Sequence, residues 1–508
     1  MFEVEANAAA WFVDRHAEGA RRDHSAFVEA GGAGRRLSYG DLAERAGRVG
    51  GLLAEAGVER ESRVALLMTD TADLPVVFWG AIKAGVVPVP LNTMLSGELY
   101  QSILANCRAR ALFVSPELFP VVAMFLGELP ELQATYLVGP EFEAALARNE
   151  AKPTVAVSPD ECAFWLYSSG STGEPKGVRH AHASLRATAD TYASQVLGIA
   201  SDDVVFSAAK LFFAYGLGNA MTFPMSVGAT AVLYPGRPTP EAVLDVLARF
   251  RPSVFCGVPT LYAALNARLE AEGAKVETTL RRCLSAGEAL PEEVGLKWAR
   301  LSGCHILDGV GSTEMLHIFL SNRPGDVVYG TSGVAVPGYE LQLVDEHGDE
   351  VGEGEIGELL VKGESAALDY FGRREKSRAT FEGVWTRTGD KYEKLAGARY
   401  RYCGRTDDMF KVSGIWVAPF EIEQALASHH KVLEAAVIPA RDADGLEKPK
   451  AYVVLKAGVS QEGVAAELQA HVKDRVGLWK YPRWLAFVED LPKTATGKIQ
   501  RFKLREWG

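Results

Sequence analysis

The segment that most restricts how this chain can fold is a loop of small residues at 168–177, directly after the apolar run 163–167. An apolar run of this length is typical of a buried strand. The glycines of the loop permit a backbone that a Cβ would obstruct, and its hydroxyls together with Lys176 suit phosphate oxygens. Pro175 precedes Lys176, whereas a P-loop ends in Gly-Lys-Ser/Thr, so a P-loop kinase is disfavoured. A flexible Gly/Ser linker is the plain alternative, and it explains this order of residues poorly.

The composition fits an ordinary globular enzyme. The chain has 508 residues, of which 48% are hydrophobic and 23% charged, so more than one domain is expected. The net charge of -11 argues against broad nucleic-acid binding. The six cysteines form no CxxC pair, so neither a zinc site nor a disulfide framework is indicated, and a reducing compartment fits best.

The N-terminal residues lack the basic start and apolar core of a signal peptide. No later stretch stays apolar long enough to span a bilayer. We therefore expect a cytoplasmic protein that does not use a membrane as a partner.

Helical and strand-like patterns alternate along the chain. Ser38 and Asp41 resemble a capping box before a helix whose apolar face repeats through residue 53, and residues 64–68 then read as a strand. Asp73 is the expected N-cap of the next helix, over residues 73–84. Further strand-like segments lie at 86–90, 230–233 and 253–256. This alternation predicts an α/β fold with layered, largely parallel sheets.

A domain boundary is expected near Gly404. Residues 405–508 change to a compact mixture of strands at 434–438 and 451–455 with a helix at 464–476, which predicts a small α+β domain. Residues 1–404 then form a large N-terminal α/β domain.

A second phosphate-type signature, at residues 492–501, contains Lys498. Between the two signatures lie four more short motifs, at residues 285–290, 308–314, 386–390 and 404–408. Each motif alone is compatible with an ordinary turn or helix cap. In this order they resemble the adenylate-forming superfamily of acyl-CoA synthetases, luciferases and adenylation domains, over essentially the whole chain.

The resemblance implies an enzyme that activates a carboxylate with ATP, and it assigns a role to each motif. The implied catalytic residues are Lys498, Lys176, Thr313 and Glu314, with Glu314 also holding Mg²⁺, a hard cation that prefers oxygen ligands. Asp390 is the implied ribose ligand and Arg405 a second nucleotide contact. The other implied ATP- and AMP-binding residues are Ser168, Ser169, Gly170, Ser171, Thr172, Gly173, Gly287, Glu288, Ala289, Asp308, Gly309 and Ser312.

The same resemblance implies that the small C-terminal domain is a mobile lid. Asp407 matches the pivot of the lid, and Lys411, Ser413 and Gly414 match the turn that lines the pantetheine channel of coenzyme A. Coenzyme A is the expected acceptor of the acyl group, because no carrier domain follows Lys498.

The substrate class depends on residues 210–219 and 314–319, which resemble the benzoate-CoA and 4-hydroxybenzoate-CoA ligases. Phe213 stands where many relatives carry histidine, which agrees with the benzoate branch. The expected pocket residues are Phe213, Ala214, Tyr215, Gly309, Gly311, His317 and Ile318. Core packing is the alternative for these aromatic residues, and His317 either packs against the ring, binds a para hydroxyl or is a satisfied neutral histidine.

Benzoate is the first choice of substrate, with 4-hydroxybenzoate or another aryl or acyl acid as the alternative. A luciferase-like oxidative fate of the adenylate, or a non-catalytic nucleotide-binding protein, are distant alternatives. A homodimer, and a lysine acetyltransferase acting on Lys498, stay open as partners.

Overall fold

A computed structural model of the chain contains two compact units. The model describes residues 2–31, 34–169, 175–276, 279–406, 408–412, 415–443, 446–477, 480–493 and 499–507. The first unit comprises Met1–Leu341 and Val361–Arg387, and the second comprises Gln342–Leu360 and Thr388–Gly508. The chain passes between the units within strands β16 (Glu340–Val344), β17 (Ile356–Lys362) and β20 (Trp385–Leu395). The predicted boundary after residue 404 lies inside the second unit.

The first unit is built around a nine-stranded sheet. Its strands, in spatial order, are β15 (Val334–Ala335), β14 (Ile318–Ser321), β13 (Ile306–Gly311), β12 (Arg282–Ser285), β11 (Val254–Gly257), β9 (Val204–Ser207), β10 (Thr230–Leu233), β1 (Ser25–Glu29) and β2 (Arg36–Ser38). The six strands from β13 to β1 are parallel, and β14, β15 and β2 are antiparallel to their neighbours. The predicted, largely parallel α/β architecture is confirmed.

Two smaller sheets complete the strand framework of the first unit. A four-stranded parallel sheet contains β4 (Val87–Pro90), β3 (Arg63–Leu67), β5 (Ala109–Val114) and β6 (Ala134–Leu137). A three-stranded antiparallel sheet contains β18 (Asp369–Tyr370), β8 (Pro175–Ala181) and β7 (Cys162–Ser169).

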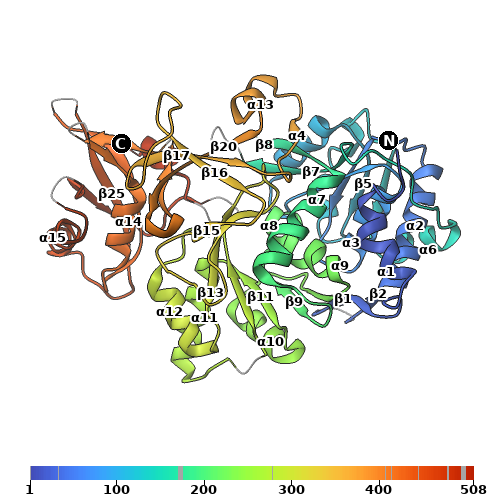
Figure 1. Ribbon diagram of the computed structural model, residues 1–508, viewed down its shortest axis with the longest axis horizontal. Coiled ribbons are helices and arrows are strands. Elements are labelled where there is room, and N and C mark those ends of the chain that lie inside the picture. The colour runs from blue at the N-terminus through green and yellow to red at the C-terminus, as the bar shows by residue number, and fades with distance from the viewer. Residues whose placement is uncertain are drawn as a thin grey trace. The chain divides into compact units, whose positions relative to one another are not determined.

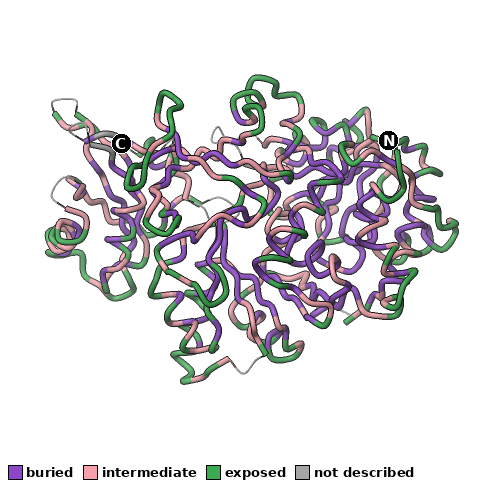
Figure 2. Tube along the Cα trace, in the orientation of Figure 1, coloured by how far each residue is buried: buried purple, intermediate pink, exposed green. Residues whose placement is uncertain are grey.

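Helices cover these sheets because their apolar faces match the sheet surfaces. The longer helices of the first unit are α2 (Tyr39–Glu55), α3 (Asp73–Lys83), α4 (Gly97–Cys107), α6 (Pro140–Arg148), α10 (Pro240–Phe250), α11 (Pro259–Glu272) and α12 (Glu292–Ser302). Helices α10, α11 and α12 lie against the nine-stranded sheet (Figure 1). They bury Val246, Tyr262 and Trp298 in a core shared with strands of this sheet. The central strands of this sheet are buried, whereas these helices keep an exposed outer face (Figure 2).

Helix α2 follows its predicted pattern. The hydroxyl of Ser38 accepts from the backbone N–H of Asp41, and the carboxylate of Asp41 accepts from the backbone N–H of Ser38, which completes the capping box. All four residues of its predicted apolar face are buried: Leu42, Ala46, Val49 and Leu53.

The predicted N-cap of α3 is wrong. Ala72 is the N-cap residue, and Asp73 is the first helical residue. The carboxylate of Asp73 instead binds Arg35 at 2.6 Å and Arg45 at 3.3 Å. Two cations from distant parts of the chain therefore occupy the oxygens that would cap the helix.

The second unit is an α+β arrangement. Its three-stranded sheet contains β24 (Val432–Arg441), β25 (Glu447–Leu455) and β26 (Trp484–Phe487). Helices α14 (Pro419–Ala427) and α15 (Val464–Val476) share a core with one face of this sheet, and α16 (Arg501–Glu506) packs on other residues of β24 and β25. Strands β20 and β21 (Arg399–Arg405) form an antiparallel pair in the same unit.

Among the described residues, no helix combines the length and the apolar composition that crossing a membrane requires.

Candidate active site

The small-residue loop lies in a hairpin between β7 and β8. Ser168 and Lys176 are opposite each other in the antiparallel register of these strands. A Cβ added at Gly177 would lie 3.2 Å from the ring of Trp165, so a larger residue would crowd the hairpin there. Gly170, Ser171, Thr172 and Gly173 lie outside the described residues, as does the side chain of Ser169.

A second loop, at residues 312–317, joins β13 to β14 and carries the predicted catalytic Thr313 and Glu314. Three consecutive carbonyl groups of this loop accept hydrogen bonds from other elements. Nε2 of His180 donates to the oxygen of Thr313 at 2.8 Å, the backbone N–H of Ala367 to that of Glu314 at 2.7 Å, and the hydroxyl of Ser365 to that of Met315 at 2.8 Å. Ser312 adds a further bond, because its Oγ accepts from the backbone N–H of Met315 at 3.1 Å. These hydrogen bonds fix the backbone of the loop that carries the predicted catalytic residues Thr313 and Glu314.

Tyr370 connects two of the predicted catalytic residues. Its hydroxyl donates to Oε1 of Glu314 at 2.7 Å, and Nζ of Lys176 lies 4.8 Å from the centre of its ring. Tyr370 pairs with Val178 in the β18–β8 register, so β8 positions both Lys176 and the partner of Glu314. Sequence analysis did not identify Tyr370, and no local motif marks it.

His180 is a second residue that sequence analysis did not identify. Its side chain is fully buried on β8 and stacks on Phe164 with 5.1 Å between ring centres. Burial lowers the pKa of His180 to about 4, so the imidazole is neutral near pH 7. Because a carbonyl oxygen only accepts, the single N–H of the ring must be at Nε2, facing Thr313.

The two predicted adenine-side motifs are neighbours in the sheet. Ser285, at the end of β12, pairs with Asp308 on β13. Gly287 follows in an exposed turn with φ of +95°, a conformation that favours glycine. Asp308 is buried, and burial raises the pKa of its carboxyl to about 8. The turn at Gly287, Glu288 and Ala289 thus begins beside Asp308.

The predicted substrate residues Tyr215 and His317 stack on each other. Their ring centres are 5.7 Å apart with 28° between the ring planes, and Nε2 of His317 donates to the carbonyl oxygen of Tyr215 at 3.3 Å. Tyr215 lies in α8 (Ala214–Leu217), and its hydroxyl donates to the carbonyl oxygen of Gly257 at 3.2 Å. Phe213 is the N-cap residue of α8. Ala214 is the first residue of that helix, so both residues directly precede Tyr215, the one that contacts His317.

His317 is almost completely buried within a group of rings. Phe223 and Tyr192 lie 4.4 Å and 5.3 Å from it, measured between ring centres. Burial lowers the pKa of His317 to about 3, so the ring is neutral at physiological pH. Since Nε2 carries the hydrogen, Nδ1 is an acceptor, and it has no hydrogen-bond partner within the described part of the chain.

Glycines bring β13 against β14 at the same place. A Cβ at Gly309 would lie 3.0 Å from Cγ2 of Ile318, and one at Gly311 would lie 2.5 Å from the carbonyl oxygen of His317. A larger residue at Gly311 would therefore displace the backbone of the loop 312–317. Five of the seven predicted pocket residues meet here: Tyr215, Gly309, Gly311, His317 and Ile318.

In the second unit, Asp390 and Arg405 form an ion pair. Oδ1 of Asp390 lies 2.9 Å from Nη1 of Arg405, and the two residues are opposite each other in the β20–β21 register. Nη1 of Arg405 also donates to the carbonyl oxygen of Thr388 at 3.0 Å. The two predicted nucleotide contacts of this unit are thus held by each other.

Four predicted residues of the second unit, Asp407, Ser413, Gly414 and Lys498, lie outside the described residues, as does the side chain of Lys411. Residues close to Asp407 and to Lys498 are described, and they bind each other. Asp408 binds Arg501 at 3.1 Å and Arg505 at 3.0 Å, and Arg501 also binds Glu423 at 2.7 Å. The segment that follows Lys498 is therefore tied to the residue after Asp407.

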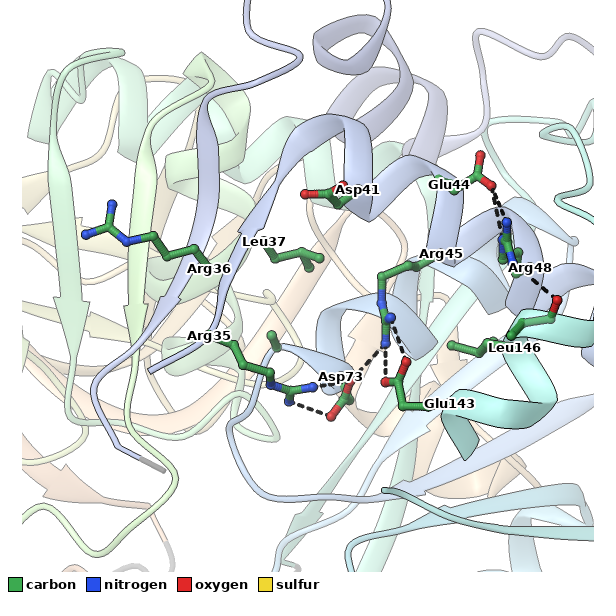
Figure 3. Close-up of a pocket in the computed structure, with 12 residues that line it drawn as sticks. Arg35, Arg36, Leu37, Asp41, Glu44, Arg45, Arg48, Asp73, Glu143 and Leu146 are labelled. Carbon is green, nitrogen blue, oxygen red and sulfur yellow. Dashed lines mark hydrogen bonds and ion pairs between the residues drawn. The ribbon is translucent and has the colours of Figure 1, made fainter. Parts of the chain in front are cut away.

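A cavity of about 480 Å³ on the first unit is separate from these residues (Figure 3). Arg35 and Arg45 both bind the carboxylate of Asp73 there, and Arg45 also binds Glu143 at 2.5 Å. Its lining includes none of the predicted site residues that the structure describes. The cations that Figure 3 shows at its centre are neutralised by carboxylates, which disfavours a phosphate site.

Comparison with protein families identifies two matches. Residues 13–371 match the model of the AMP-binding enzyme family, and residues 421–498 match that of the AMP-binding enzyme C-terminal domain.

Individual relatives match over nearly their whole lengths. A 4-hydroxybenzoate-CoA/benzoate-CoA ligase of Rhodopseudomonas palustris is 52% identical, over 98% of this chain and 94% of that protein. The crystal structure of a benzoate CoA ligase from Burkholderia xenovorans LB400 is 49% identical with a TM-score of 0.90, over 98% of this chain and 99% of that one. An anthranilate CoA ligase solved in complex with anthranoyl-AMP is 41% identical with a TM-score of 0.93, over 99% of this chain and 97% of that one.

Proposed function

This chain belongs to the AMP-binding enzyme family, and from that premise we propose that it is an AMP-forming aryl-CoA ligase acting on benzoate. In the first step the carboxylate attacks the α-phosphate of ATP, which gives benzoyl-adenylate and pyrophosphate. In the second step the thiol of coenzyme A attacks the acyl carbon, and AMP leaves. The overall products are benzoyl-CoA, AMP and pyrophosphate.

One observation carries this proposal. The loop 312–317 has Glu314, the residue of the nucleotide motif, only three positions from His317, which stacks on Tyr215. An apolar ring held beside His317 would therefore have its reacting end close to the nucleotide side of the loop. Holding the two reactants together in this way removes much of the entropic barrier to adenylation.

Adenylation also requires cations, because a carboxylate must approach a polyanion. We assign this role to Lys176 and Lys498, which would neutralise charge that develops on the α-phosphate. Acetylation of Lys498 by a lysine acetyltransferase would remove one of these charges. Asp390 and Arg405 are proposed to bind the ribose and phosphate side of the nucleotide.

The residues around Glu314 fit a magnesium ion. Its carboxylate is half-buried, and Tyr370 orients one of its oxygens by a 2.7 Å hydrogen bond. Oxygen ligands of this kind are what Mg²⁺ prefers, and the ion usually completes its shell with substrate phosphates and water. When bound, Mg²⁺ would neutralise the part of the phosphate charge that Lys176 and Lys498 do not neutralise.

We propose that residues 405–508 act as the lid, with Asp407 as its pivot. Lys411, Ser413 and Gly414 would then line the channel for coenzyme A in the second step. Two chemical steps that need different residues from one domain require that domain to rotate.

A second candidate substrate, 4-hydroxybenzoate, is favoured by the unpaired acceptor Nδ1 of His317 among the described residues. A phenolic hydroxyl is a donor and could satisfy it, whereas the para hydrogen of benzoate could not.

The test is to measure pyrophosphate exchange and thioester formation with benzoate, 4-hydroxybenzoate and acetate. Exchange with benzoate before CoA is added, followed by CoA-dependent benzoyl-CoA, is expected. ATP use with acetate but with neither aromatic acid would contradict the proposal. A higher kcat/KM for 4-hydroxybenzoate than for benzoate, lost in His317→Leu, would make 4-hydroxybenzoate the preferred substrate.

A further inference from the structure

Three of the ten histidines of the chain gather at one place in the second unit, where helices α14 and α15 meet. His429 and His430 lie directly after α14, with 4.5 Å between their ring centres. His471 lies on α15, one helical turn after Glu467, and its ring centre is 4.9 Å from that of His429. None of these residues belongs to the proposed catalytic machinery.

The donor atoms of this cluster are close enough to share one ion. Nε2 of His429 lies 3.2 Å from Oε1 of Glu467, and the donor atoms of His429, His430 and Glu467 all lie within 4.8 Å of one another. Two ligands that are each about 2.0–2.2 Å from a tetrahedral Zn²⁺ lie roughly 3.3–3.5 Å apart. The His429–Glu467 pair is therefore already close to the separation of two zinc ligands, and the exposed side chain of His430 would join them by rotation.

The surroundings hold the ligands in place. Nζ of Lys431 binds Oε2 of Glu467 at 2.6 Å, which fixes the carboxylate and leaves Oε1 toward His429. Oγ of Ser428 lies 2.9 Å from Nε2 of His471. Binding through Nε2 of His429 would move the ring hydrogen to Nδ1, at the expense of a 3.4 Å hydrogen bond from the backbone N–H of Lys431.

We propose that His429, His430 and Glu467 form a binding site for a divalent transition-metal ion of the Zn²⁺, Co²⁺ or Ni²⁺ class, with the ring of His471 packed beside His429. Imidazole nitrogens select such ions over Mg²⁺, which takes oxygen ligands. The site is thus chemically different from the magnesium site at Glu314. Because two ligands come from the segment directly after α14 and Glu467 comes from α15, the ion would hold these two elements together and stabilise the second unit.

The experiment uses the full chain without a histidine tag, freed of metal with EDTA and dialysed. Titration with Co²⁺, followed by visible absorption, and with Zn²⁺, followed by calorimetry, is expected to give one bound ion per chain. His429→Ala, His430→Ala and Glu467→Gln should each weaken binding by at least about tenfold. His347→Ala is the matched control, because His347 is an exposed histidine of the same unit that lies outside the cluster, and it should bind as the wild type does.

Zn²⁺ should also raise the Tm of the wild type and of His347→Ala but not that of Glu467→Gln, which keeps the shape of the glutamate. This comparison holds even if His429→Ala folds poorly. Unchanged affinity in Glu467→Gln and His430→Ala would overturn the proposal, because the cluster would then be only a hydrogen-bonded helix contact. Thiolate charge-transfer absorption with Co²⁺ would also overturn it, because the ion would then be bound by cysteine.

Discussion

Tyr370 donates a hydrogen bond of 2.7 Å to Glu314, 56 residues earlier in the chain. The bond fixes one oxygen of the carboxylate that the nucleotide motif contributes. The same tyrosine ring lies 4.8 Å from Nζ of Lys176. Tyr370 belongs to none of the sequence motifs. It nevertheless contacts both Glu314 and Lys176, the two charged residues that the proposed mechanism uses in this unit.

Replacing Tyr370 with phenylalanine should therefore impair adenylation. A hydrogen bond to a charged group contributes about 1.5–3 kcal/mol, so benzoate-dependent pyrophosphate exchange should fall roughly 10- to 100-fold. Thioester formation from supplied benzoyl-adenylate should change little. Tyr136→Phe, which removes a phenol from β6, is the control and should keep full exchange. Wild-type exchange in Tyr370→Phe would show that Glu314 does not depend on this bond.

The elements that sequence analysis located well are those whose signals are local. The capping box at Ser38 and Asp41 marked the start of α2, and the pattern of α15 gave its observed bounds, Val464–Val476. Both signals lie within a few residues of the element itself.

The failures involve partners far away in sequence. Asp73 has the side chain of a good N-cap, but Arg35 and Arg45 bind it after the chain has folded. His180 supports Thr313 across 133 residues, and a single histidine on an apolar strand gives no sign of such a partner. The motifs therefore predict which residues touch the nucleotide, but they do not indicate His180 and Tyr370, which hold motif residues in place.

The terminal motif predicts a second effect on the first step alone. Lys498→Ala should lower adenylation roughly 10²–10³-fold, comparable to removing one donor aimed at developing charge. Thioester formation from supplied benzoyl-adenylate should remain largely intact, since that step needs no attack on phosphate. Lys493→Ala is the control, because Lys493 lies in the same terminal segment but pairs with Glu434 at 2.7 Å. Undiminished benzoyl-CoA synthesis from benzoate and ATP in Lys498→Ala would exclude the assignment.

His180 should make the protein less stable in acid. Its folded pKa of about 4 lies below the value of about 6.5 in an unfolded chain, so between these values the unfolded state binds more protons. The free energy of unfolding should consequently fall as pH falls from about 6.5 to 4, by up to roughly 1.4 kcal/mol per pH unit from this residue. His180→Gln, which keeps a donor for Thr313 but does not titrate, should show a shallower decrease in urea unfolding experiments.

A second variant of His180 separates the effect of its hydrogen bond to Thr313 from the effect of its titration. His180→Leu also does not titrate, but it leaves the carbonyl oxygen of Thr313 without its partner. It should share the shallower pH dependence of His180→Gln and lose more adenylation activity than that variant. Equal slopes in all three proteins would mean that His180 does not titrate as described.

The pocket residues should control aryl selectivity more than ATP affinity. Ala214→Leu adds volume at the start of α8, and overfilling a fitted cavity typically costs about 1–3 kcal/mol. Tyr215→Ala removes the ring that stacks on His317. Relative kcat/KM values for benzoate and its para-substituted analogues should change in both variants, while the KM for ATP changes little. Unaltered ratios would place these residues outside the site.

The residues on either side of Asp407 are anchored. The backbone N–H of Thr406 donates to the carbonyl oxygen of Gly389 at 2.8 Å, and the carboxylate of Asp408 binds Arg501 and Arg505. The proposed rotation of the lid would therefore be absorbed between these two anchored residues, at Asp407.

Asp407→Pro should trap the lid, because proline fixes φ at its own position and restricts the residue before it. The expected result is benzoate-dependent pyrophosphate exchange close to that of the wild type, with benzoyl-CoA formation strongly suppressed. Ala457→Pro is the control. Ala457 precedes Gly458, which has φ of +81°, in a turn closed by a hydrogen bond from the N–H of Val459 to the carbonyl oxygen of Lys456. Proline is well tolerated at this position of such a turn, so both activities should survive there. An equal loss of exchange and thioester formation in a folded Asp407→Pro protein would indicate general damage and count against the pivot.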